Sequence, residues 1–197
     1  MAKSFFTDLA TKAFRAGVTP RTDASRRWFQ GEVRNIRNIN RRKLLKDPAL
    51  EPRNRARVGS MYMYFYNPKH EATLPYYDLF PLTIMVQPVP GGFHGLNLHY
   101  LPPALRARLF DSLVDLTNNK KYDESTRFKL TYDLLKSASK MRFFKPCYKH
   151  YLYSQIEGRV AMVEAPAWEM ALFLPTEQFR KSTKTAVWKD SREAIRG

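Results

Sequence analysis

The stretch from residue 59 to residue 103 constrains the fold most, because it contains most of the strand-like sequence of the chain. In the run MYMYFY at residues 61–66, methionine or phenylalanine alternates with tyrosine. A period of two places these two sets on opposite faces of a β-strand, so both faces are expected to be partly covered. Residues 82–87 and 95–101 are typical of two further strands, and the turn formers at residues 88–92 are expected to connect them. The stretch predicts a small antiparallel sheet.

Amphipathic helices are predicted to pack on this sheet. Prolines at residues 102–103 indicate a helix start, because proline fits the first turn of a helix. A second helix is predicted over residues 123–140. The first helix has an apolar side made of leucines at spacings of four, four and three: Leu105, Leu109, Leu113 and Leu116.

The remaining third of the chain predicts shorter elements. Beyond residue 176 the sequence is polar and basic, with Phe179 and Trp188 as isolated apolar anchors. The elements expected before it are strands at 148–155 and 159–163, a turn at residues 157–158 and a short helix at 167–172.

The first 58 residues are the most basic part of a chain whose net charge is +16: they contain 15 lysines and arginines against 5 aspartates and glutamates. A short amphipathic helix is predicted over residues 4–16, and a second helix from Asp23 or Ser25 to about Lys46. Residues 47–58 have two prolines and no periodicity, which is typical of a linker. Such a charge indicates either a polyanionic or acidic partner or a solvated charged face.

These patterns predict an α+β fold. We expect a small antiparallel β-sheet or partly open barrel packed by two amphipathic helices, with an extended basic helical N-terminal arm. The predicted divisions are a basic arm with two short helices and a linker at residues 1–58, an α+β core at 59–175 and a basic tail at 176–197.

Two sets of residues are candidates for binding a partner. Aromatic side chains on short strands can stack on the bases of a single-stranded nucleic acid, but they are more often core residues or protein-contact residues. A protein contact is therefore favoured. The core candidates are Tyr62, Tyr64, Tyr66, Tyr76 and Tyr77. The arm candidates are Trp28, Phe29, Arg26, Arg27, Arg34, Arg37, Arg41 and Arg42.

Catalytic and metal sites are not expected. The spacing of Cys147 and His150 is compatible with half of a zinc site, but a closed site needs four ligands and the sequence has no second cysteine. His94 and His99 are five residues apart and would point to opposite faces of a strand. No phosphate-binding loop or dinucleotide fingerprint occurs, so no cofactor is expected. Carboxylates without a recognisable magnesium-binding spacing are Asp78, Asp111, Asp115 and Glu164.

A single cysteine and the absence of a long apolar run indicate a protein made in the cytoplasm without a membrane span. Three segments, LPYYDLFP at 74–81, GGFHGLNLHYLPPALRARLFDSL at 91–113 and FFKPCYKHYL at 143–152, are similar to a family of virion proteins of contractile-tailed bacteriophages. The resemblance covers about residues 25–190. It implies a tail or baseplate component, or a protein that protects DNA ends, and carries no residue-specific role.

The sequence therefore predicts a non-enzymatic structural component of a tailed phage particle, in the tail or baseplate, that joins neighbouring subunits through its arm and sheet edges. The alternative is a DNA-binding virion protein that contacts or protects packaged DNA ends. A third hypothesis is a nuclease or other enzyme with an unrecognised site. The expected partners are other virion proteins, with DNA as the second candidate and no small-molecule substrate. The expected location is the virion, after assembly in the host cytoplasm.

Overall fold

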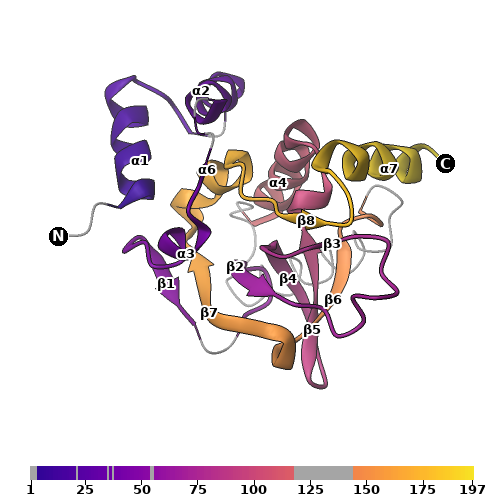
Figure 1. Ribbon diagram of the computed structural model, residues 1–197. Helices are drawn as coiled ribbons and strands as arrows, with labels where there is room; N and C mark the ends of the chain where they lie inside the picture. The colour runs from indigo at the N-terminus through magenta and orange to yellow at the C-terminus, as the bar shows by residue number, and fades with distance from the viewer. Residues whose placement is uncertain (1–3, 21, 35, 37, 54–55, 118–143) are drawn as a thin grey trace.

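The computed structural model describes residues 4–20, 22–34, 36, 38–53, 56–117 and 144–197, and for residues 112–117 only the backbone is described (Figure 1). The helix predicted at residues 123–140 lies outside the described residues, as do Arg37 and the side chain of Leu113. In the described part of the chain, no helix is both long enough and apolar enough to span a bilayer.

Six strands form one antiparallel sheet in the order β1-β7-β2-β4-β5-β6, which is open rather than closed into a barrel (Figure 1). A two-stranded sheet, β3-β8, lies beside it. The predicted α+β class and antiparallel sheet are confirmed. The strands are β1 (Leu50–Pro52), β2 (Met61–Tyr66), β3 (Tyr77–Asp78), β4 (Leu82–Val89), β5 (Gly92–Asn97), β6 (Tyr148–Leu152), β7 (Ile156–Val163) and β8 (Phe179–Arg180).

Strand β2 has both of its faces covered, as its alternating sequence predicts. Met61 and Met63 belong to the main apolar core. Tyr62, Tyr64 and Tyr66 belong to a second cluster on the other face, together with Phe93, Tyr151, Met85 and Met162. The sheet therefore separates two apolar layers.

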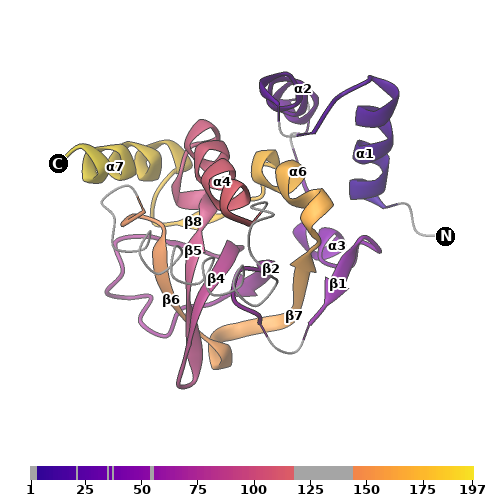
Figure 2. The same ribbon diagram turned by 180° about the vertical axis from the view of Figure 1, so that it is seen from behind.

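The helices gather along one side of the sheet (Figures 1 and 2). Leu109 on α4 is buried in the main core, as the leucine spacing predicts. The short helix predicted at residues 167–172 is confirmed as α6. The α-helices are α1 (Phe5–Arg15), α2 (Asp23–Arg34), α3 (Arg41–Leu44), α4 (Pro103–Thr117), α6 (Trp168–Phe173) and α7 (Lys184–Arg196). The 3₁₀ helices are η1 (Leu98–Tyr100), η2 (Tyr153–Gln155) and η3 (Ala165–Ala167).

The basic N-terminal region differs from the predicted helices and linker. The single helix predicted up to Lys46 is wrong, because α2 ends at Arg34 and the Asn40 side chain caps α3 by accepting from the amide of Lys43 at 2.9 Å. The linker predicted at residues 47–58 contains β1, whose buried Leu50 pairs with Val163. Its prolines are compatible with a strand at the edge of a sheet.

The N-terminal helices also pack on the rest of the chain. Phe6, Leu9 and Phe29 belong to the same buried cluster as Met61. The hydroxyl of Ser25 donates to Glu169 on α6 at 2.6 Å. The division into arm, core and tail stays a prediction, but the described arm is folded against the core.

Three further expectations need correction. The turn predicted at Glu157 and Gly158 lies instead at η2, because Gly158, with φ +71°, lets β7 continue through a register shift against β2. The strand predicted to run to residue 101 ends at Asn97, whose side chain caps η1. The tail forms β8 and α7, and Trp188 on α7 donates to the carbonyl of His99 at 2.8 Å.

Candidate functional site

Three neighbouring pockets share lining residues, and we call them together the basic groove. The first pocket, of about 620 Å³, lies between β1, β4, η2 and β7. It shares Gly158 and Arg159 with a second pocket of about 500 Å³ beside α3. The second shares Arg42, Phe65 and Glu157 with a third pocket of about 630 Å³ that reaches β3 and β8.

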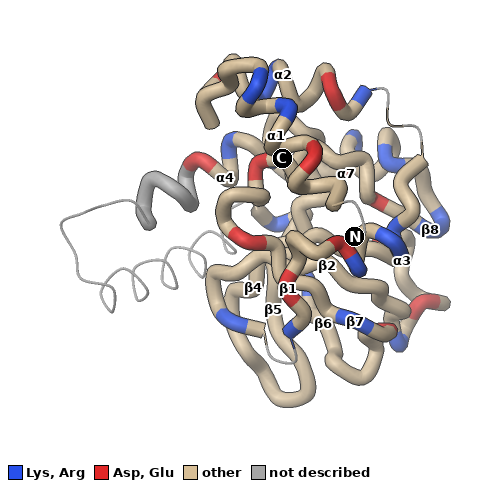
Figure 3. Tube along the Cα trace, turned by 90° about the vertical axis from the view of Figure 1, so that its left-hand side faces the viewer, with Lys and Arg blue, Asp and Glu red and all other residues tan. Residues whose placement is uncertain are grey.

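The groove is lined by more cations than anions. In Figure 3, basic positions on α3 and next to β8 lie on the same side of the molecule. An excess of positive charge along a depression attracts polyanions. The cations that line it are Arg42, Lys46, Arg53, Arg159 and Arg180, and the carboxylates are Glu71 and Glu157.

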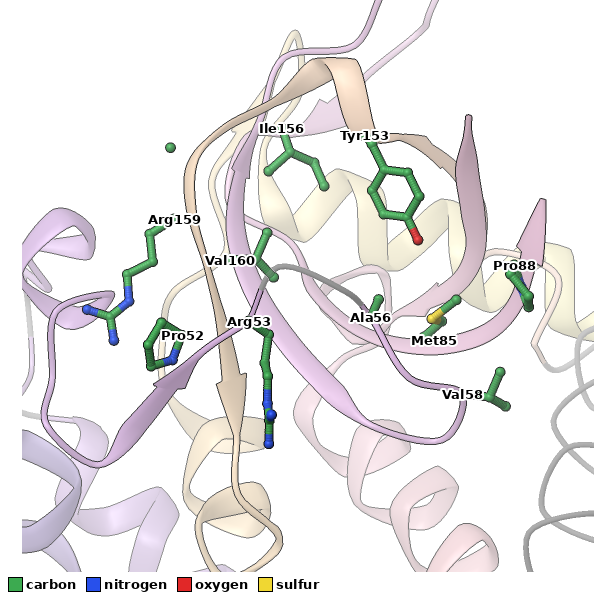
Figure 4. Close-up of a pocket in the computed structure, with 11 residues that line it drawn as sticks. Pro52, Arg53, Ala56, Val58, Met85, Pro88, Tyr153, Ile156, Arg159 and Val160 are labelled. Atoms are coloured by element: carbon green, nitrogen blue, oxygen red, sulfur yellow. The ribbon is translucent and has the colours of Figure 1, made fainter. Parts of the chain in front are cut away.

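The first pocket has two chemically different sides (Figure 4). Arg53 and Arg159 lie on one side with Pro52, and Tyr153 and Met85 lie on the other. The floor between them is apolar and is made by Ile156 and Val160 of β7. The pocket can therefore accept a ligand with an anionic part and an apolar or aromatic part.

The two arginines of the first pocket have spare donors. Arg53 donates through Nη2 to Glu51 at 2.7 Å, and Arg159 donates through Nη2 to the carbonyl of Leu50 at 3.2 Å. The Nε atoms of both are buried and have no acceptor among the residues that the structure describes. A guanidinium has five N–H donors, so the donors of Arg53 and Arg159 that are accessible and not used in these bonds can serve an anionic ligand.

Tyr153 supplies an accessible aromatic ring. It is 44% exposed, and its ring centroid lies 5.6 Å from that of buried Phe93. Burial of part of the side chain raises the pKa of its hydroxyl above the ordinary value, so the side chain stays neutral near pH 7. Phe93 supports the ring from the sheet side and leaves the rest of its surface accessible.

The predicted tyrosine set is divided between the interior and the surface. Tyr62 and Tyr64 are fully buried, and their hydroxyls bond to the amide of Arg57 at 2.7 Å and to the Thr83 hydroxyl at 3.2 Å. Tyr66 is also buried but borders the third pocket. Tyr77, whose hydroxyl donates to Glu71 at 2.9 Å, lines the same pocket.

Tyr76, the last of the set, packs against Tyr100 and Phe179 instead, with ring centroids 6.0 and 6.4 Å away. The partner-binding role predicted for the tyrosines stays a prediction.

The predicted arginine set does not form one surface either. Arg42 lines the groove, where its guanidinium lies 5.5 Å from the ring centroid of Phe65. Arg41 instead donates to the carbonyls of Thr176 and Glu177, and Arg26 pairs with Asp23 and Asp111. The other described members on α2 are the exposed Arg27 and Arg34, half-buried Trp28 and buried Phe29.

Sequence patterns missed five of the charged and aromatic groove residues: Lys46, Arg53, Arg159, Arg180 and Tyr153. Arg159 follows Gly158, which has a positive φ in the irregular part of β7. Such irregular positions redirect side chains and follow no period. The one available signal was the basic composition of residues 1–58, which contributes Arg42, Lys46 and Arg53.

The histidines and the cysteine do not form a metal centre in the described residues. Cys147 is buried, and burial raises the pKa of its thiol to about 12, whereas His150 is exposed. His94 contacts Tyr148, whose hydroxyl lies 2.8 Å from His94 Nδ1. These residues are spread over β5, β6 and the turn before β6.

Thr176, His99 and Asp78 resemble a hydrolase triad in geometry. His99 Nδ1 donates to Asp78 at 2.6 Å, and its Nε2 lies 3.0 Å from the Thr176 hydroxyl. All three are buried, and Asp78 also accepts from the amides of Phe80 and Gln178. A nucleophile needs access to its substrate, so this network is a polar part of the core.

Comparison with known proteins adds one match. A family model described as "Phage T4 terminal DNA protecting protein" matches residues 1–191. Searches of curated proteins and of solved structures found no match to the chain.

Proposed function

Because the chain belongs to the family of the phage T4 terminal DNA protecting protein, we propose that it is a virion protein that binds the ends of a phage DNA molecule and shields them. The observation that carries this proposal is the match over residues 1–191, which includes every residue of the basic groove. The groove supports it independently, because arginines that line a depression suit a phosphate backbone.

This proposal takes up the alternative drawn from the sequence rather than the tail or baseplate role. The family description names DNA termini and no part of a tail. Shielding requires only that the protein occupy the DNA end, so we propose a binding protein without a catalytic step. The burial of the Thr176, His99 and Asp78 network supports this view.

Contacts with neighbouring virion proteins are a second proposed activity. Phe14 on α1 is 84% exposed on the described surface. An exposed phenylalanine on an amphipathic helix is suited to a protein contact. This surface is formed by α1, and the groove is formed by other elements.

Protection of linear DNA from an exonuclease tests the main proposal. Purified protein should slow the digestion of linear duplex DNA. The groove variant replaces the exposed groove cations Arg42, Lys46 and Arg180 with glutamine. It should need about ten times more protein to give the same protection. The matched control replaces Lys189, Arg192 and Arg196 with glutamine (the α7 variant). These exposed cations are on α7, at the end of the molecule opposite α3 and β1 (Figures 1 and 2).

The α7 variant removes the same charge and should protect as the native protein does. Equal loss in both variants would mean that only net charge matters. Unslowed digestion at saturating native protein would contradict the proposed function.

A further inference from the structure

The size of the first pocket limits what it can hold. Its volume of about 620 Å³ is within the range of pockets that enclose one drug-sized molecule. A nucleotide or two is of that size, whereas a DNA duplex is far larger and could only cross the pocket mouth. The pocket therefore suits unpaired nucleotides.

The two sides of the pocket match the two parts of a nucleotide. Arg53 and Arg159 are on one side, to either side of Pro52, and their positive charge can attract a phosphate. Tyr153, supported by Phe93, is on the other side, where a base can stack on its exposed ring. The apolar floor at Ile156 and Val160 suits the edge of a base better than a second charge.

We propose, building on the DNA-end function, that this pocket binds the last unpaired nucleotides of a single DNA strand. The terminal base stacks on Tyr153 and the adjacent phosphate accepts from Arg53 and Arg159. The rest of the groove, with Arg42, Lys46 and Arg180, follows the phosphate backbone of the DNA behind the end.

This arrangement distinguishes an end from the interior of a duplex. Phosphates occur along the whole molecule, so contacts at Arg42 and Arg180 carry no information about an end. Unpaired bases occur where a duplex ends or frays, because bases in the interior of a duplex are paired and stacked on their neighbours. A pocket that admits only unpaired bases thus makes binding selective for ends.

Fluorescence anisotropy with the full-length chain tests this inference. The probes are one duplex with blunt ends, the same duplex with a single-stranded overhang of about four nucleotides, and the same duplex closed at both ends by non-nucleotide linkers, which leave no unpaired base. We expect binding to the overhang duplex to be about tenfold tighter than to the blunt duplex, and the closed duplex to bind most weakly. Probes with 3′ and 5′ overhangs measure which strand end is preferred.

The variants Tyr153→Leu and Tyr153→Phe separate stacking from folding. Tyr153→Leu should remove the preference for the overhang duplex over the blunt duplex, while Tyr153→Phe should retain it. Arg159→Gln should weaken overhang binding, and a thermal melt shows whether it remains folded.

Equal affinity for overhang and blunt duplexes, or an overhang preference unaffected by Tyr153→Leu, would overturn the inference while exonuclease protection could persist. Failure of the proposed function would differ, because open and closed duplexes would then bind alike and no protection would be seen.

Discussion

Asp78 shows how one buried side chain can connect distant parts of the chain. It accepts from His99, Asn97, Phe80 and Gln178, at distances from 2.6 to 3.2 Å. Burial acts to raise the pKa of this carboxyl, but the charge of His99 and these hydrogen bonds outweigh it, so the pKa lies below the ordinary value. The carboxylate is therefore held ionised in the folded protein.

This lowered pKa predicts a pH dependence of stability. The unfolded chain takes up a proton near the ordinary aspartate pKa of about 3.9, and the folded chain does so only at lower pH. The contribution of Asp78 is fully present above about pH 4 and is lost as the pH falls through the folded pKa. Asp78→Asn should lower the free energy of unfolding at pH 7 by about 1–3 kcal/mol, with a smaller difference near pH 3.

Urea denaturation between pH 7 and pH 3 measures the effect. Asp23→Asn is the control, because its carboxylate is 84% exposed. A difference between native and Asp78→Asn proteins that stays constant over this range would argue against the assigned pKa.

The limits of sequence reasoning at this scale follow from local geometry. Met61 and Tyr62 were predictable, because a regular strand alternates its faces. Tyr153 and Arg159 were not, because η2 and the irregularity at Gly158 break that period. Their position at one pocket also depends on β1, which no sequence pattern indicated.

At the scale of elements, α4 is anchored by both apolar and polar contacts. Leu109 is 1% exposed, and Phe110 packs edge-on against Trp168 with ring centroids 5.9 Å apart. The buried Arg106 donates to the carbonyls of Leu101 and Leu172 at 2.7 and 3.0 Å. These contacts fix α4 against α6 and against the residues that precede α4.

Removing the Leu109 side chain should therefore destabilise the fold strongly. Leu109→Ala is expected to reduce the free energy of unfolding by about 2–5 kcal/mol through lost burial and a cavity. Ala104→Gly, on the exposed side of the same helix, should cost no more than about 1 kcal/mol. Chemical denaturation compares them, and equal midpoints for the two variants would refute the docking of α4.

The N-terminal helices predict a second effect at this scale. The sequence alone favours an arm that neighbouring subunits hold, which would be cleaved quickly in the isolated protein. Because Phe6, Leu9 and Phe29 are buried in the common core, we now expect helices α1 and α2 to resist trypsin despite their basic residues. Phe29→Ala should expose these helices to cleavage, whereas Phe14→Ala should not, since Phe14 is 84% exposed.

Limited proteolysis followed by mass spectrometry identifies the cut sites. Rapid cleavage between residues 22 and 34 in the native protein would mean that α2 is held by a partner rather than by its own core.

At the scale of the whole molecule, the basic charge of the first 58 residues meets that of the core at the groove. Arg42, Lys46 and Arg53 come from the first region, and Arg159 and Arg180 come from segments more than a hundred residues later. Counting charges along the sequence predicts the excess of basic residues. It does not predict that these residues lie together in the groove, because their proximity depends on the antiparallel pairing of β1 with β7. The resemblance of residues 74–81, 91–113 and 143–152 to a phage family is confirmed by the family match.

The salt dependence of DNA binding tests whether the groove as a whole contacts phosphates. Each neutralised duplex phosphate contributes about 0.9 to the logarithmic slope of affinity against salt, because bound counterions are released. If Arg42, Lys46 and Arg180 each contact one phosphate, the groove variant should lower the magnitude of the slope by about 2.7. The α7 variant removes three cations of equal charge on α7 and should leave the slope nearly unchanged. Titrations at several salt concentrations with one linear duplex give both slopes, and the same decrease in both variants would place the phosphate contacts outside the groove.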